Sequence, residues 1–372
     1  GWVIYYFKAY CQMAFTGVNL MGESANLSGE FFSSFISSPF APFGYGVIFI
    51  FASSAVIMLG VKNGIEKSNL VMMPILFLMA ILISVYVITM PGSGDGIKYY
   101  LVPNMRCLTT ADGNFSIALL GKTLLGATGQ MFYSLSLAMG IMITYGSYMK
   151  KGDSIEKCVR RIEIFDTLVA LLAGLMIIPV VYLFAVKTGT PVDEAMKAGP
   201  GLMFITLPKV FASLGSSGAY VGMAFFLLVI FAAATSAISL YEACVASVCD
   251  LLKLERKAAT FFTGALILSL STFSALGYGA WSKVTLFGMQ FLDFFDFITN
   301  SVLMPIVAGI TCIFVGWVIK PRAIIDECEA GGTTMKAKAF YSFMVRYLAP
   351  ALMVALLISE VCRALKIGGW SI

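Results

Sequence analysis

Hydroxyl side chains interrupt a long uncharged segment near the middle of the chain. The segment covers residues 123–149, and Tyr133, Ser134 and Ser136 lie near its centre. Such residues weaken a membrane helix, and irregular backbone at that depth is tolerated only where it is buried in protein or lines a water-filled cavity. In carriers, these breaks are the places where helix ends and freed backbone groups meet substrates and ions. The stretch 129–140 therefore predicts a solute-binding site and favours a transporter.

A second group of oxygen atoms is predicted in the uncharged segment 219–241. Thr235 and Ser236 carry hydroxyls on consecutive residues, and the carbonyl of Ala232 lies one helical turn before them. Hydroxyl and carbonyl oxygens suit hard cations such as sodium. These residues predict a cation site, with close helix packing through small residues as the alternative.

An acidic residue opens the apolar segment 167–186. Asp166 stands directly before this segment, about one turn after Arg160 and Arg161. An acid inside a membrane costs about 2.5–3.5 kcal/mol on insertion scales and is a functional candidate by default. Asp166 is therefore either a functional carboxylate or an interfacial residue that pairs with one of the two arginines.

Three further acids lie near the predicted ends of membrane segments. Glu242 and Asp250 follow the predicted hydroxyl pair by about two and four helical turns. They could gate an inner vestibule, or they could pair with Lys253. Asp293, near the outer end of its segment, has the same two alternatives as Asp166, a functional carboxylate or an interfacial residue in an ion pair.

Aromatic and helix-weakening residues complete the set of candidates. Trp2 and Tyr6 open the first apolar segment, where aromatic residues are most often anchors at the membrane interface. Gly64 and Pro74 lie ten residues apart at the start of the third segment. A glycine and a proline at this spacing make a segment easy to unwind, and proline-kinked packing is the alternative.

The composition is that of an integral membrane protein. Apolar residues make up 59% of the 372 residues and charged residues 12%, whereas a soluble domain has about 25% charged residues. The absence of histidine removes His-based triads, His general bases and His metal ligands. The eight cysteines form no CxxC pair. The net charge is +5, and the lysines and arginines fall mainly into short loops between the apolar segments. Neither an enzyme nor a nucleic-acid partner is expected.

Nine uncharged or nearly uncharged segments approach the length of about 20 residues that spans a bilayer. They cover residues 1–22, 44–61, 70–90, 123–149, 167–186, 219–241, 258–282, 297–319 and 340–359. Lysine and arginine concentrate in the loops after the second, fourth, sixth and eighth segments, so the positive-inside rule places these loops in the cytoplasm. We expect a multi-pass protein of the inner (plasma) membrane whose visible chain begins inside the cell and ends outside.

Two of the outer loops are long, 91–116 and 187–218. Short helices packed over the outer mouth are expected in them, and solvated loop is the alternative.

Several segments, taken in order, resemble the neurotransmitter:sodium symporters, and among them the bacterial amino-acid carriers. Residues 129–140 resemble the unwound sixth helix of that family, residues 232–240 its sodium-binding eighth helix, and residues 204–208 its outer-loop lid. The spacing from Gly64 to Pro74 resembles the element that unwinds to let solvent reach the inner site. The resemblance covers essentially the whole chain.

The resemblance implies an all-α integral membrane protein with the leucine-transporter-like fold of two inverted five-helix repeats. The nine visible helices would be the third to the eleventh of the family, in a single transporter domain, 1–372, that lacks the first two helices. Residues 1–90 would be the remainder of the first repeat, residues 117–319 the second repeat, and residues 340–365 the last helix.

The resemblance also implies roles for single residues. The substrate would contact Trp2, Tyr6, Tyr133, Ser134, Ser136, Met139, Ser236 and Leu240. A first sodium ion would bind Ser134 and Asp166, and a second would bind Ala232, Thr235 and Ser236. The gates would contain Tyr148, Glu242, Asp250 and Asp293. Gly64 and Pro74 would mark the inner path that unwinds.

Two departures from the family pattern carry information. Asp166 stands where the family commonly has an asparagine ligand, and Ala170 replaces a polar residue that helps hold chloride in animal members. A carboxylate at this place could supply the negative charge that chloride otherwise gives, so chloride-independent transport is expected. Ala138, at a position often occupied by glycine, and the following Met139 favour a pocket for an apolar or aromatic amino acid.

The expected function is therefore sodium-coupled symport of an amino acid into the cell by alternating access. Sodium ions at two sites would be the coupling ions, and no organic cofactor is expected. The protein would work in the bilayer as a monomer or a weak homodimer. One alternative is a non-functional fragment of such a symporter. A membrane channel is the other, and it would lack saturable, sodium-dependent binding.

Overall fold

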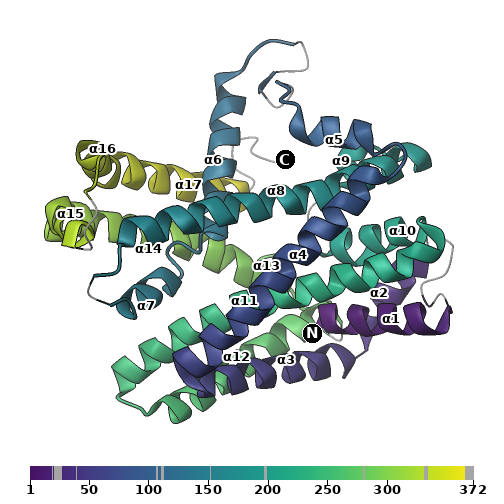
Figure 1. Cartoon of the computed structure of the whole chain (residues 1–372), viewed down its shortest axis with the longest axis horizontal. Coiled ribbons are helices and arrows are strands. Elements are labelled where there is room, and N and C mark those ends of the chain that lie inside the picture. The colour runs from purple at the N-terminus through teal and green to yellow at the C-terminus, as the bar shows by residue number, and fades with distance from the viewer. Residues whose placement is uncertain are drawn as a thin grey trace. The chain divides into compact units, whose positions relative to one another are not determined.

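The computed structural model is helical throughout the residues that it describes (Figure 1). It describes residues 1–18, 20, 27–38, 40–105, 108–109, 113–150, 152–196, 199–279, 281–330 and 334–364. Cys107 and the end of the predicted last helix, at residue 365, lie outside these ranges.

The helices group into two compact units. Unit 1 contains residues 1–103 and 168–292, and unit 2 contains residues 104–167 and 293–372. The helix α8 (Ile155–Thr188) begins in unit 2 and ends in unit 1. The division into inverted repeats stays a prediction.

Unit 1 contains long apolar helices joined by short ones. Its α-helices are α1 (Trp2–Thr16), α2 (Leu27–Ser37), α3 (Ala41–Met58), α4 (Lys67–Thr89), α5 (Ser93–Leu101), α9 (Val192–Ala195), α10 (Leu207–Ala212), α11 (Gly218–Leu252) and α12 (Arg256–Gly277). Its short helices of other types are η1 (Val61–Glu66), η3 (Leu202–Thr206) and η4 (Gly215–Ser217).

Unit 2 contains the helices on both sides of the predicted break. Its α-helices are α6 (Ile117–Ser134), α7 (Ile141–Ser147), α13 (Phe291–Asp296), α14 (Met304–Ile313), α15 (Pro321–Ala330), α16 (Lys338–Phe343) and α17 (Ala349–Ala364). Its π-helical stretches are η5 (Phe297–Leu303), η6 (Phe314–Ile319) and η7 (Met344–Leu348).

Within the described residues, seven helical stretches are long and apolar enough to cross a membrane. The other two of the nine predicted spans take different forms. The first is the 15-residue helix α1, and residues 123–149 form two helices, α6 and α7, with a break between them. The two long loops, 91–116 and 187–218, both contain short helices (α5, α9, η3 and α10), as predicted.

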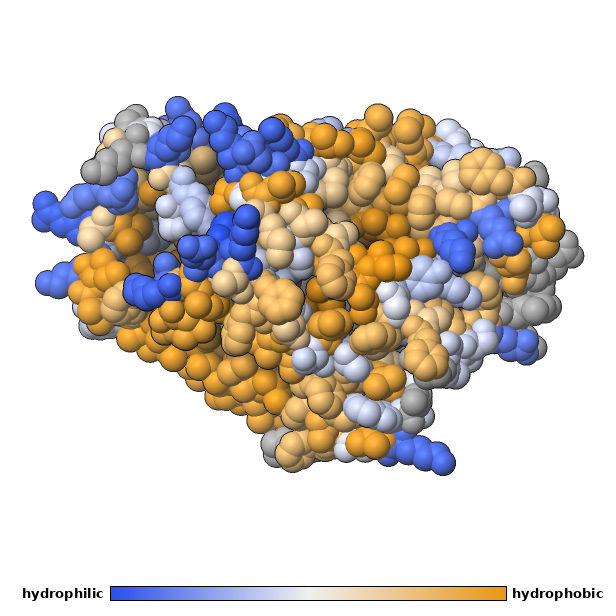
Figure 2. All heavy atoms as spheres, turned by 90° about the horizontal axis from the view of Figure 1, so that it is seen from below, coloured by the Kyte–Doolittle hydropathy of each residue, from blue (hydrophilic) through white to orange (hydrophobic). Residues whose placement is uncertain are grey.

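Large apolar side chains stay exposed along the long helices. Phe51 on α3 is 68% exposed, Leu266 on α12 is 53% exposed and Ile310 on α14 is 61% exposed. On the face drawn in Figure 2, hydrophobic side chains cover most of the area between separate hydrophilic groups. Exposed apolar surface on this scale marks membrane or protein contact, and together with the seven long apolar helices it fits an integral membrane protein.

The core of unit 1 lies where α1 packs against α11. Tyr6 and Tyr10 are fully buried on α1 and both contact Phe226 of α11. Close approach of the two helices depends on Gly222, because a Cβ atom there would lie 2.2 Å from Cε1 of Tyr10. Aromatic packing against a glycine surface therefore fixes how α1 lies on α11.

Candidate functional site

The helix of the fourth predicted span is broken at its hydroxyl-rich centre. The helix α6 ends at Ser134 and α7 begins at Ile141. Between them Ser136 has φ 54°, Ala138 has φ 60° and Gly140 has φ 79°. Positive φ is uncommon outside glycine and costs backbone energy. The predicted interruption of this helix is confirmed.

The last residue of α6 contacts the carboxylate of Asp166. The Ser134 hydroxyl donates to Oδ1 of Asp166 at 2.7 Å and lies 3.0 Å from Oδ2. Asp166 is half-buried on α8, and within the described residues it forms no ion pair with Arg160 or Arg161. The alternative of an interfacial pair with arginine is therefore not what the structure shows. A carboxylate and a hydroxyl at this separation form an oxygen-rich pair that suits a hard cation.

A second oxygen pair lies on α11, in unit 1. The Thr235 hydroxyl donates to the carbonyl of Ala232 at 3.0 Å and to that of Phe231 at 3.1 Å. Thr235 is 4% exposed, whereas Ser236 is exposed. The helix continues unbroken around these residues. The hydroxyl oxygen of Thr235 therefore lies beside the carbonyl oxygen of Ala232, one turn earlier. The two atoms could serve together as ligands of one cation.

The predicted substrate residues of α1 lie in an aromatic cluster. The Tyr6 hydroxyl donates to the carbonyl of Phe204 at 2.8 Å, and Tyr6 is completely buried. The Trp2 ring makes edge contacts with Phe32, Phe204 and Tyr278 at centroid distances of 5.5–5.6 Å. Phe204 therefore contacts both predicted substrate residues of α1, Trp2 and Tyr6. The sequence predicted a lid at residues 204–208. It did not predict the hydrogen bond from Tyr6 to Phe204, because the two residues are 198 positions apart in the chain.

Glu242 is held by a partner that the sequence did not indicate. Its two carboxylate oxygens accept from Nη1 and Nη2 of Arg256 at 3.0 and 2.6 Å. Nε of the same arginine donates to the carbonyl of Ile57 at 3.1 Å. Of the two alternatives for Glu242, pairing with Lys253 is not the one found, because the carboxylate pairs with Arg256. Asp250, the other acid on this part of α11, is exposed and forms no ion pair within the described residues.

The predicted inner path begins with irregular helix. Residues 61–66 form the π-helix η1, which follows Gly60 at φ 85°. A Cβ atom at Gly64 would lie 1.9 Å from the carbonyl oxygen of Val56, so only glycine fits there. Pro74 lies inside α4 and removes one backbone donor from that helix. Both features weaken regular helical bonding over the segment that was predicted to unwind.

The remaining predicted residues are distributed over both units. In unit 2, Tyr133 is 56% exposed beside the break, and Ser136 and Met139 are half-buried within it. Tyr148 follows the last residue of α7, and Asp293 lies in the first turn of α13.

Leu240, in unit 1, is exposed on a groove that Gly1 and Cys244 also line. The candidate residues therefore fall into two groups, one in each unit. Unit 1 carries Trp2, Tyr6 and the Thr235 group, and unit 2 carries the break and Asp166.

Comparison with known proteins gives a consistent result. A family model described as the sodium:neurotransmitter symporter family matches residues 46–370. An uncharacterized sodium-dependent transporter of Bacillus subtilis, YhdH, is 33% identical over 94% of this chain and 72% of its own length. One from Haemophilus influenzae is 30% identical over 87% of this chain and 66% of its own length.

A solved structure shares the fold. The crystal structure of MhsT in complex with L-phenylalanine matches with a TM-score of 0.80 and 32% sequence identity. The match covers 96% of this chain and 76% of that chain.

Proposed function

Because the chain belongs to the sodium:neurotransmitter symporter family, we propose that it carries an amino acid into the cell together with sodium. Members of the family are sodium-coupled transporters and not enzymes. The observation that carries the proposal is the broken helix whose last hydroxyl, on Ser134, contacts the Asp166 carboxylate. A break of this kind at membrane depth is where carriers bind their solutes.

Sodium would be held at two positions. Ser134 and Asp166 supply a hydroxyl and a carboxylate for the first ion. The Ala232 carbonyl and the Thr235 and Ser236 hydroxyls supply neutral oxygens for the second. An ion can drive transport only if it binds one conformation better than the other. Such a preference would arise if the oxygens around the first ion, in unit 2, and those around the second, in unit 1, are arranged for binding in only one conformation.

The substrate would be an apolar or aromatic amino acid. Its carboxylate would lie near the first sodium ion and the Tyr6 hydroxyl, which would exchange its bond to Phe204 for one to the substrate. Trp2, Leu240 and Met139 would surround the side chain, with Tyr133 closing over it and Ser136 offering a hydroxyl. The phenylalanine in the MhsT crystal structure supports an aromatic substrate.

Two gates would alternate access. Tyr148, Glu242 and Asp250 would belong to the inner gate, and Asp293 to the outer one. The π-helical stretch η1 and Pro74 would allow the start of α4 to open a path for sodium to the cytoplasm. The protein would act as a monomer or weak homodimer in the inner membrane.

Uptake of labelled L-phenylalanine into proteoliposomes tests this function. We expect saturable uptake that requires an inward sodium gradient and stops when sodium is replaced by N-methylglucamine. Thr235→Val, which keeps the side-chain volume but removes the hydroxyl, should lower the apparent sodium affinity by about tenfold. The control is Ser247→Ala, which removes an exposed hydroxyl three turns further along α11 and should leave the apparent sodium affinity unchanged. Flux that neither saturates nor responds to sodium would indicate a channel and contradict the proposal.

A further inference from the structure

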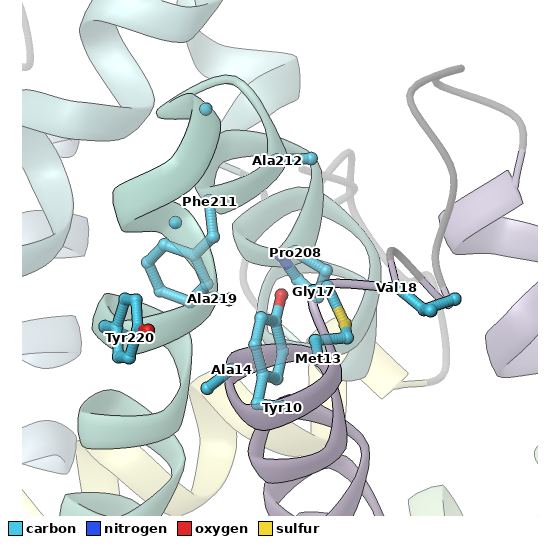
Figure 3. Close-up of a pocket in the computed structure, with 12 residues that line it drawn as sticks. Tyr10, Met13, Ala14, Gly17, Val18, Pro208, Phe211, Ala212, Ala219 and Tyr220 are labelled. Atoms are coloured by element: carbon cyan, nitrogen blue, oxygen red, sulfur yellow. The ribbon is translucent and has the colours of Figure 1, made fainter.

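A cavity of about 290 Å³ lies in unit 1 where the end of α1 meets α10 and the start of α11 (Figure 3). Its walls are mostly apolar, and no side chain that lines it carries a formal charge. The residues that shape it are Tyr10, Met13, Val18, Pro208, Phe211 and Tyr220. Because one water molecule takes about 30 Å³ of liquid, the space suits one organic molecule of roughly ten heavy atoms.

Tyr10 presents a polar group to this cavity. The residue is 1% exposed, and its hydroxyl end lies beside Pro208 and Gly17 in Figure 3. Within the described residues this hydroxyl has no hydrogen-bond partner. Buried tyrosine hydroxyls nearly always have a partner, as Tyr6 does one turn earlier on the same helix. The Tyr10 hydroxyl is therefore a donor available to a ligand.

We propose that the cavity is a binding site for a small uncharged molecule with an apolar body and one hydrogen-bond acceptor. The acceptor would take a hydrogen bond from Tyr10, while the apolar body would pack against Met13, Pro208 and Phe211. A zwitterionic amino acid fits poorly, because no side chain that lines the cavity carries a charge that could pair with either of its charges. The ligand is thus neither the sodium nor the amino acid of the proposed function, and the site is separate from the Thr235 group.

Binding can be measured without transport, by ¹⁹F NMR titration of the protein in lipid nanodiscs. The probe is 4-fluoroacetophenone, which has one acceptor, and its reference is 1-ethyl-4-fluorobenzene, which has none. We expect saturable binding of the ketone that is about tenfold weaker in Tyr10→Phe, since one neutral hydrogen bond is lost. Binding of the hydrocarbon should not change. Tyr5→Phe, on the same helix but outside the cavity, is the matched control.

A second variant tests the place of binding. Ala14 lines the cavity, and Ala14→Phe should fill it and abolish saturable binding of both probes. Ala52→Phe, at an exposed position of α3, should not. The proposal is overturned if the ketone binds equally to wild type and Tyr10→Phe. It is also overturned if saturable binding survives Ala14→Phe, or if both probes only partition into lipid. Because no step depends on sodium or on uptake, failure here would leave the proposed transport function intact.

Discussion

Asp166 and Ala170, one turn apart on α8, set the charge beside the proposed first sodium ion. The Asp166 carboxylate lies against the Ser134 hydroxyl and forms no ion pair in the described part of the chain. A carboxylate in such surroundings is costly unless a cation compensates it. Ala170 offers no polar atom that could hold an anion. A fixed negative charge on the protein can therefore replace a bound chloride.

This arrangement predicts transport that does not need chloride. Replacement of chloride by gluconate should leave the rate of sodium-dependent uptake unchanged. Asp166→Asn keeps the shape but removes the charge, and it should weaken the apparent sodium affinity by about tenfold or more. Glu163→Gln removes an exposed acid one turn earlier on the same helix and serves as the control. A large loss of rate in gluconate would refute the chloride hypothesis.

At the scale of single elements, the break after α6 is a strained structure that the rest of unit 2 must hold. Ser136 and Ala138 both adopt the left-handed backbone region that favours glycine. Such a residue costs about 1–2 kcal/mol. A β-branched residue fits this region worst.

Ala138→Val adds a β-branched side chain to a residue that is already strained, and it should therefore lower the stability of the protein by about 1 kcal/mol or more. Thermal unfolding in detergent, followed by tryptophan fluorescence, measures this change. The same substitution at Ala127, an exposed helical position of α6, should cost less than about 0.7 kcal/mol. Equal effects at the two positions would show that the backbone at Ala138 is not strained.

The Glu242–Arg256 pair is a polar connection between α11, α12 and the end of α3. Glu242 is completely buried, whereas the Arg256 side chain is 32% exposed. Loss of the arginine removes two hydrogen bonds from a completely buried carboxylate, whereas loss of the acid leaves a cation that water can reach. The two single substitutions should therefore have unequal effects.

We expect Arg256→Gln to destabilise the protein by about 2–4 kcal/mol, and Glu242→Gln by less. The double variant should regain part of the loss, because it leaves no isolated charge in the interior. Melting temperatures of the three variants, with Lys257→Gln at an exposed neighbouring position as control, provide the measurement. A double variant no more stable than Arg256→Gln would mean that the two residues do not act as a pair.

These elements also show what the sequence could and could not predict. Most of the membrane helices could be predicted from the length and hydropathy of the uncharged segments. The break could be predicted from the hydroxyl side chains of residues 133–136. Both features depend on local composition. The partners of Tyr6 and Glu242 depend on which helix faces meet after folding. Lys253 is closer in sequence to Glu242 than Arg256 is, yet it is Arg256 that reaches the carboxylate.

At the scale of the whole molecule, the distribution of basic residues predicts which loops face the cytoplasm. Residues 150–161, which include the start of α8, are rich in lysine and arginine, whereas loop 91–116 is not. Basic loops are retained on the cytoplasmic side during insertion. The exposed Cys158 near the start of α8 should then face inward, and the exposed Val102 after α5 should face outward.

A membrane-impermeant maleimide tests this orientation in variants that keep a single cysteine, either Cys158 or Val102→Cys. Intact cells should label only Val102→Cys, and inside-out vesicles should label only Cys158. Lysed membranes should label both, which controls for reactivity. The reverse pattern would place the gates and both proposed sodium positions in an inverted protein. A sodium gradient directed into the cell would then meet the face that we assign to substrate release, and the proposed direction of transport would fail with it.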